Sequence, residues 1–200
     1  ANPPLLMIAF CPEPKSKSNK EQLEQLKNYK IEYEGKDEVF RDMFIFSVYA
    51  GGLRFSDVVT LKWENFNAKE NRITKTIRKT GRQHSFKIGQ QALDILQNYK
   101  SELTKPTDFI FPIIEDQELF EMNKNTEAHI INAKNILCGQ KLRRLGKAME
   151  LPFTLSFHLS RHTFATMALN KGMRIEHVSK LLNHRDISTT QIYAKIVNEE

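Results

Sequence analysis

A dense apolar segment, Asp37–Tyr49, restricts the fold of this chain more than any other feature. Its apolar residues are too closely spaced to occupy a single helical face, which is typical of a helix buried in a core. Gly51 and Gly52 follow directly and end the helix. We therefore predict a largely buried helix and assign the apolar residues from 39 to 53 to the core.

The composition agrees with a soluble globular chain. Of its 200 residues, 40% are hydrophobic and 27% are charged, which excludes a disordered tail or a fibrous repeat. No apolar run reaches the roughly 18 to 20 residues that span a bilayer, and no secretory leader is recognisable. Cys11 and Cys138 lie far apart without a CxxC pairing, which favours a reducing, cytoplasmic setting over a disulfide framework.

The remaining pattern predicts a mainly α-helical chain with a small antiparallel β-sheet, an α+β fold. The proline-rich residues 1–19 are expected to be a connector, and residues 20–200 are expected to form one folded domain. Two strands, 72–79 and 82–88, flank Thr80-Gly81 as a hairpin, and 63–67 is a candidate third strand. Ser56 and Ser188 are the predicted N-caps of two helices. Further helices are predicted over 20–29, 90–103, 127–149, 159–170, 175–182 and 188–197, with an irregular stretch over 109–125.

Positive charge is concentrated on the predicted hairpin and the helix after it. The net charge of the chain is +6. Between residues 72 and 105 the acidic residues are Asp94 and Glu102 alone, whereas Lys or Arg occupies positions 72, 75, 78, 79, 82, 87, 100 and 105. Such a segment is compatible with a polyanionic partner. A second cluster, Lys141, Arg143, Arg144 and Lys147, is equally well explained as the solvated face of a helix.

The C-terminal part holds the residues with the clearest chemistry. His158 and Arg161 stand three apart at a helix start, so both can face one ligand. Arginine offers a rigid fork of donors to phosphate oxygens, and a helix N-terminus adds oriented N–H groups. His184 and Tyr193 follow on short helices that can fold back toward the same place. His158 and His162 also have the spacing of two metal ligands, but no third ligand is evident.

These residues together resemble the catalytic domain of the tyrosine recombinases, also called phage integrases. The resemblance runs from about Lys20 to Tyr193 and is carried by six residues in the family's order: Arg54, Lys79, His158, Arg161, His184 and Tyr193. It implies that Tyr193 attacks a phosphodiester of double-stranded DNA to form a 3′-phosphotyrosyl bond. It further implies that Arg54 and Arg161 clamp the phosphate and that Lys79 protonates the 5′-oxygen. His158 would accept the tyrosine proton, His184 would bond the phosphate, and Asp57 would orient Arg54.

The implied chemistry is physically coherent. A phenol with a pKa near 10 is a poor nucleophile at neutral pH unless a base or nearby positive charge assists it. Fixed cations can stabilise the charge of a pentavalent phosphate without a metal, and the covalent bond conserves the phosphodiester energy without a cofactor. We therefore expect neither metal nor cofactor. The resemblance further implies sister subunits that assemble on DNA as a tetramer.

The chain departs from the family pattern at several positions. Asn183 stands where glycine is common before the second histidine, and Lys87 stands where proline is common. Lys87 and Lys75 are therefore rivals to Lys79. The family's N-terminal DNA-binding domain has no counterpart here, so residues 1–19 are interpreted as the connector from it.

The implied function is site-specific recombination, most simply the integration or excision of a mobile element. Chromosome dimer resolution and promoter inversion use the same chemistry. Two alternatives remain: a type IB topoisomerase-like enzyme, and a non-catalytic DNA-binding protein with the same fold.

Overall fold

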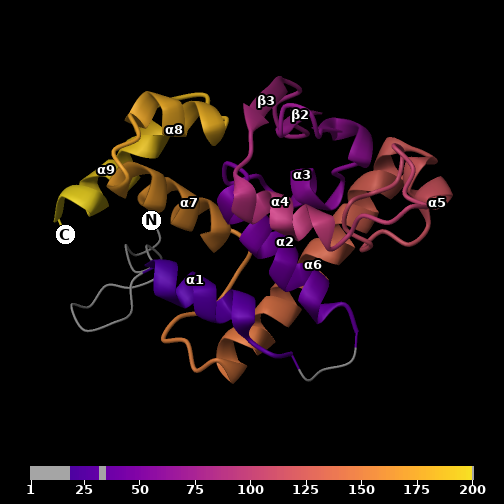
Figure 1. Cartoon of the computed structure of the whole chain (residues 1–200), viewed down its shortest axis with the longest axis horizontal. Helices are drawn as coiled ribbons and strands as arrows, with labels where there is room; N and C mark the ends of the chain where they lie inside the picture. Colours follow the sequence, from indigo (N-terminus) through magenta and orange to yellow (C-terminus); the bar gives the residue numbers. More distant parts are fainter. Residues whose placement is uncertain (1–18, 32–34, 200) are drawn as a thin grey trace.

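The computed structural model describes residues 19–31 and 35–199, and its architecture is mainly helical with one three-stranded antiparallel sheet (Figure 1). The predicted fold class is thereby confirmed. The proposed connector, residues 1–19, falls outside the described residues except for Asn19, which begins the first helix. The elements in order are α1 (Asn19–Asn28), α2 (Asp37–Tyr49), α3 (Phe55–Val59), the 3₁₀ turn η2 (Trp63–Asn65), β1 (Phe66–Asn67), β2 (Arg72–Thr76), β3 (Gln83–Lys87), α4 (Gln90–Gln97), α5 (Gln117–Glu121), α6 (Lys124–Ala148), α7 (Leu159–Asn170), α8 (Ile175–Leu181) and α9 (Ser188–Glu199).

Helix α2 is the centre of the core, as its composition predicts. It contacts α1, α3, α4, α6 and α7, and Figure 1 shows it passing through the middle of the molecule. Phe44 and Phe46 are fully buried and meet Phe157 and Phe111 edge to face, at ring-centroid distances of 6.3 Å and 5.4 Å. Each such ring pair stabilises the fold by about 0.5–1.5 kcal/mol beyond the effect of burying the apolar surface of the rings.

The sheet has the order β1-β2-β3, and its strands are shorter than the sequence pattern suggests. In β3 the side chains of His84 and Phe86 face inward and alternate with exposed neighbours, as a half-buried strand requires. The register of β2 and β3 ends at Thr76 and Gln83. One further bond, from the Ile77 N–H to the Arg82 carbonyl, closes the turn beyond them. Residues 77–82 therefore form a loop that carries Lys79 at its tip.

Several helix boundaries also differ from the prediction. Ser56 is not an N-cap but lies inside α3; Arg54 is the N-cap, with extended backbone, and its carbonyl accepts from the Asp57 and Val58 N–H groups. Likewise, Ser188 is the first helical residue of α9, and the Asp186 carboxylate accepts from its N–H. Helix α4 ends at Gln97, and α5 lies in the stretch predicted to be irregular.

Helices α7, α8 and α9 form a small cluster with its own apolar contacts. Tyr193 of α9 is 4% exposed and packs with Ala165, Ala168, Val178 and Leu182. The cluster is joined to the core at Gly52, where φ is +67° and an added Cβ would lie 2.9 Å from the Leu182 side chain. This close approach brings α7 against the turn that leads to Arg54.

Across the described ranges, no helix is both long and apolar enough to cross a membrane. Nor do three or more His, Cys, Asp or Glu side chains in those ranges gather closely enough to hold a metal ion.

Candidate active site

Four of the six predicted site residues line one hollow of about 460 Å³. Arg54 comes from the N-cap of α3, Lys79 from the hairpin loop, and His158 and Arg161 from the start of α7. The remaining lining residues carry no acid: Phe55, Ser56, Ala128, Ile131, Asn132, Asn135 and Phe157. The hollow is therefore a cationic site suited to an anion.

Arg54 and Lys79 present their charges freely to this hollow. Neither side chain makes a hydrogen bond or ion pair with any residue the structure describes, and Lys79 is exposed. Both cations are therefore available to a ligand without first breaking an internal contact.

Arg161, in contrast, is built into the protein. It is 5% exposed; its Nη1 donates to the Gly52 carbonyl, and its Nη2 donates to the Leu182 carbonyl at 2.7 Å. Burial and the nearby Arg54 lower its pKa to about 10, so it is still a cation at neutral pH. A guanidinium has five N–H groups, so donors remain for a phosphate while the carbonyls fix its plane.

His184 reaches the site through Arg161. Its Nε2 lies 3.4 Å from Arg161 Nη2, and its Nδ1 lies 2.9 Å from Thr190 Oγ1. Burial and the positive charges of Arg161, Arg54 and Lys79 lower its pKa to about 4. The ring is therefore neutral at neutral pH, and with Arg161 donating to Nε2 its proton belongs on Nδ1, facing Thr190.

Tyr193 does not line the hollow. Its ring packs on His162 at a centroid distance of 5.3 Å, and His162 packs on His158 at 4.5 Å, so His162 contacts both the predicted nucleophile and the predicted base. Burial raises the pKa of the Tyr193 phenol, and the positive charge of Arg161 partly offsets this. Tyr193 is thus buried between α7 and α9, outside the lining of the hollow.

His162 is the neighbour that sequence reasoning missed. Its only signal was its spacing from His158, which suggested a metal pair. Its Nδ1 is buried without a hydrogen-bond partner among the described residues, and burial with the adjacent His158 lowers its pKa to about 4. It is therefore a neutral ring at neutral pH and supports Tyr193 by packing.

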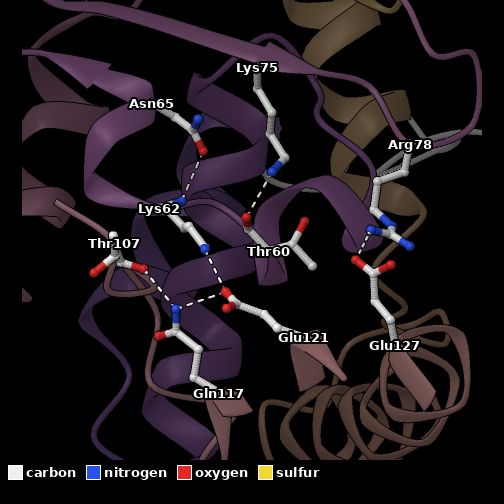
Figure 2. Close-up of polar contacts among 9 residues, drawn as sticks. All are labelled: Thr60, Lys62, Asn65, Lys75, Arg78, Thr107, Gln117, Glu121 and Glu127. Carbon is white, nitrogen blue, oxygen red and sulfur yellow. Dashed lines mark hydrogen bonds and ion pairs between the residues drawn. The ribbon is translucent and has the colours of Figure 1, made fainter. Parts of the chain in front are cut away.

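The two rival lysines lie elsewhere. The Nζ of Lys75 donates to the Thr60 carbonyl at 2.7 Å (Figure 2). Burial lowers its pKa to about 8. Lys87 lies opposite Arg72 in the register of β2 and β3, at the end of the hairpin that is farther from the loop. Of the three lysines, Lys79 alone lines the hollow.

Asp57 binds the hairpin rather than Arg54. It is fully buried, and its Oδ1 accepts the Arg78 N–H at 3.0 Å, while the described residues contain no Arg54–Asp57 ion pair. The Arg78 guanidinium pairs with Glu127 at the start of α6, as Figure 2 shows. Asp57 therefore fixes the backbone beside Lys79, which corrects the expectation that it orients Arg54.

The second basic cluster, at the end of α6, is partly structural. Lys141 and Arg144 both pair with the buried carboxylate of Asp37 in α2, whose pKa they hold below its usual range. Two of the four cations are thus used to neutralise a buried acid.

Comparison with known proteins gives one consistent answer. The family model described as the phage integrase family matches residues 18–200. Tyrosine recombinase XerD of Vibrio cholerae is 31% identical over 76% of this chain and 48% of its own length. Tyrosine recombinase XerA of Pyrococcus furiosus is 30% identical over 83% of this chain and 54% of its own length. The chain thus spans about half the length of the curated relatives it matches.

Solved structures agree at the level of the fold. A crystal structure of XerA recombinase matches with a TM-score of 0.61 at 20% identity, over 92% of this chain and 59% of that chain. XerH site-specific recombinase bound to difH substrate matches with a TM-score of 0.60 at 21% identity, over 88% of this chain and 49% of that chain.

Proposed function

Since the chain belongs to the phage integrase family, the tyrosine recombinases, we propose that it breaks and rejoins double-stranded DNA through a covalent 3′-phosphotyrosine at Tyr193. The observation that carries this proposal is the acid-free hollow in which Arg54, Lys79, His158 and Arg161 converge. These four side chains, which have complementary roles in phosphoryl transfer, line one space that an anion can enter.

In the proposed reaction, a DNA phosphate enters the hollow and its non-bridging oxygens take donors from Arg54 and Arg161. The Tyr193 oxygen then forms a bond to phosphorus as the bond to the 5′-oxygen breaks. His158, whose neutral form is favoured because burial and the adjacent cations lower its pKa, accepts the phenolic proton. Lys79 gives a proton to the departing 5′-oxygen, and His184 bonds the phosphate. Attack by a 5′-hydroxyl of another strand reverses these steps and rejoins the DNA.

The burial of Tyr193 requires a movement before this reaction. Tyr193 is 4% exposed, packs on His162 and does not line the hollow, so α9 has to shift for Tyr193 to reach the phosphate. Such a shift exposes Tyr193 to donors from Arg161 and to the base. Storage of the nucleophile would keep the enzyme inactive until DNA is bound.

The proposed setting follows from this chemistry. Recombination joins two DNA duplexes, so we propose sister subunits assembled as a tetramer on DNA in the cytoplasm, with integration or excision of a mobile element as the use. A type IB topoisomerase-like enzyme would form the same adduct but relax DNA without exchanging partners. A non-catalytic DNA-binding protein would bind without forming any adduct.

The test uses the full-length protein and a randomised library of nicked duplexes. A nick beside the cleaved bond lets the short released fragment diffuse away, so the covalent intermediate accumulates. The expected result is a protein–DNA adduct on a denaturing gel that is absent with Tyr193→Phe, and sequencing the trapped strands then gives the target. DNA binding without an adduct would favour the non-catalytic alternative.

A change at Lys79 tests the assignment of the acid. Lys79→Ala should slow cleavage of ordinary DNA by about 100-fold or more, within the range of general acid catalysis. A duplex with sulfur in place of the bridging 5′-oxygen needs little protonation and should restore the rate. Lys75→Met is the matched control, because Lys75 lies outside the hollow; rescue of that variant in place of Lys79→Ala would contradict the assignment.

A further inference from the structure

We propose that Asn183 is a positioning residue for Lys79, because its side chain fastens the hairpin loop to the turn that carries His184. The inference rests on the proposed function, in which Lys79 protonates the leaving 5′-oxygen. Asn183 Nδ2 donates to Thr80 Oγ1 at 2.9 Å, across 103 residues of sequence. Thr80 is the neighbour of Lys79, and Asn183 is the neighbour of His184, so one bond joins two parts of the site.

The backbone at Asn183 does not by itself require asparagine. The residue ends α8 in the left-handed region, with φ at +51°, and the following His184 N–H donates to the Ser179 carbonyl. Glycine adopts this conformation more readily than asparagine does. What asparagine adds is a side-chain donor aimed at the hairpin loop.

The turn that contains Asn183 is a meeting point of three elements. His84 of β3 lies with its Nε2 3.0 Å from the Leu181 carbonyl, and Arg161 of α7 donates to the Leu182 carbonyl at 2.7 Å. Burial lowers the pKa of His84, so its ring is neutral, with a proton on Nε2 for this carbonyl. Because Arg161 and the hairpin share this turn, a shift of one is transmitted to the other.

Lys79 is held from both sides while its own side chain stays free. Before it, the Arg78 N–H donates to Asp57 and the Arg78 guanidinium pairs with Glu127. After it, Thr80 is held by Asn183, and a Cβ added to Gly81 would have no atom within 4 Å. The Ile77 carbonyl also accepts from the Thr80 and Gly81 N–H groups within the loop, and the bond from Asn183 ties this side of the loop to α8.

Loss of this bond should misplace Lys79 without removing it. A proton donor acts only within hydrogen-bond reach of its acceptor, so a loop that samples other positions lowers the rate of the acid-dependent step. We expect Asn183→Gly and Thr80→Val each to slow cleavage of ordinary DNA about 10-fold. Thr80→Val also removes the longer bond from the Arg82 N–H to Thr80 Oγ1, at 3.5 Å. The double variant should therefore be no slower than Thr80→Val alone, because Asn183→Gly removes only an interaction that Thr80→Val already removes.

The experiment measures adduct formation by the full-length protein on the nicked duplex recovered from the library, with either oxygen or sulfur at the bridging 5′ position. Thr80→Ser keeps the hydroxyl and should retain the normal rate. Asn71→Gly is the matched backbone control, since Asn71 has φ at +49° and lies in the turn before β2. The sulfur substrate should bring Asn183→Gly and Thr80→Val to within about 2-fold of the unsubstituted protein.

Rescue by sulfur separates a role in positioning the acid from a general structural role, which would slow both substrates alike. Equal rates for Asn183→Gly and the unsubstituted protein on ordinary DNA, or equal slowing on both substrates, would overturn the inference. The absence of an adduct from the unsubstituted protein would instead contradict the proposed function, on which the inference depends.

Discussion

Single residues at the site divide into those that keep a charge and those that lose it. Arg161 is charged at neutral pH despite its burial, because its pKa falls only to about 10. His162 and His184, with pKa values near 4, are neutral. The positive potential of the site therefore comes from arginine and lysine, and His162 and His184 are uncharged acceptors or packing groups.

Lys75 offers a test of this electrostatic account through stability. Its folded pKa of about 8 lies below the ordinary value of 10.5, because burial disfavours the ammonium ion. Between these values the unfolded chain binds more protons than the folded one, so stability should rise with pH. Urea denaturation across that interval should show the unsubstituted protein gaining stability relative to Lys75→Met.

Lys87→Met is the control for this measurement, because Lys87 is exposed at the end of β3. Its stability difference from the unsubstituted protein should stay flat over the same pH interval. The same flat difference for Lys75→Met would show that Lys75 is solvated.

At the scale of elements, the site depends on a close approach between the α2–α3 turn and α7. Gly52 has φ at +67°, and a Cβ there would lie 3.1 Å from Phe164 and 3.4 Å from the Arg161 backbone. Gly52→Ala should therefore lower the free energy of unfolding by about 1–3 kcal/mol and displace Arg161. Chemical denaturation and adduct formation measure the two effects.

Gly172→Ala is the matched control for the close approach. Gly172 also has positive φ, at +79°, but an added Cβ would meet nothing within 4 Å. It should show the backbone strain alone and leave cleavage unchanged. Equal losses of activity in the two variants would rule out the contact with α7 as the cause.

Helix α9 should loosen when DNA binds. The account requires Tyr193 to leave its packing against His162, so amide hydrogen exchange in α9 should quicken in the presence of a bound duplex, while α2 stays protected. Unchanged exchange in α9 under conditions that produce the adduct would contradict a stored tyrosine.

The boundaries of an element could be predicted from the sequence where its apolar residues recur with a clear spacing. The strongly apolar α2 and the helix α7 begin and end at the predicted residues, because burial and glycine define them locally. Ser56 was wrong as a cap because the chain is already helical at Phe55, with Arg54 in extended backbone. The short helix α5, capped by Asp116, was missed, since five residues give too little periodicity.

Within the site, sequence order indicated which residues come together but not their spacing. The predicted residues that line the hollow lie in turns or at helix starts: Arg54 caps α3, Lys79 lies in the hairpin loop, and His158 and Arg161 lie at the start of α7. The packing of Tyr193 on His162 depends on how α9 packs on α7, a tertiary contact that no local pattern specifies. The bond between Asn183 and Thr80 is equally non-local.

At the scale of the whole molecule, affinity for DNA should depend on salt. The net charge of +6 and the basic hairpin favour release of counterions from DNA, so the logarithm of the binding constant should fall linearly with that of salt concentration. Arg82 is exposed beside Gly81 in the hairpin loop, and we expect it to contact a DNA phosphate. Arg82→Ala should reduce the slope by about 0.9, whereas Lys27→Ala in α1 should leave it unchanged.

The central claim, that Tyr193 becomes bonded to a DNA 3′-phosphate, is tested most directly by mass spectrometry of the trapped adduct. Adduct formed by the full-length protein on nicked duplexes would be digested with nuclease and trypsin and the peptides sequenced. The account predicts a nucleotide joined through its 3′-phosphate to Tyr193, together with a released strand that has a free 5′-hydroxyl. A nucleotide on any other residue, or a 5′-phosphate link, would contradict it.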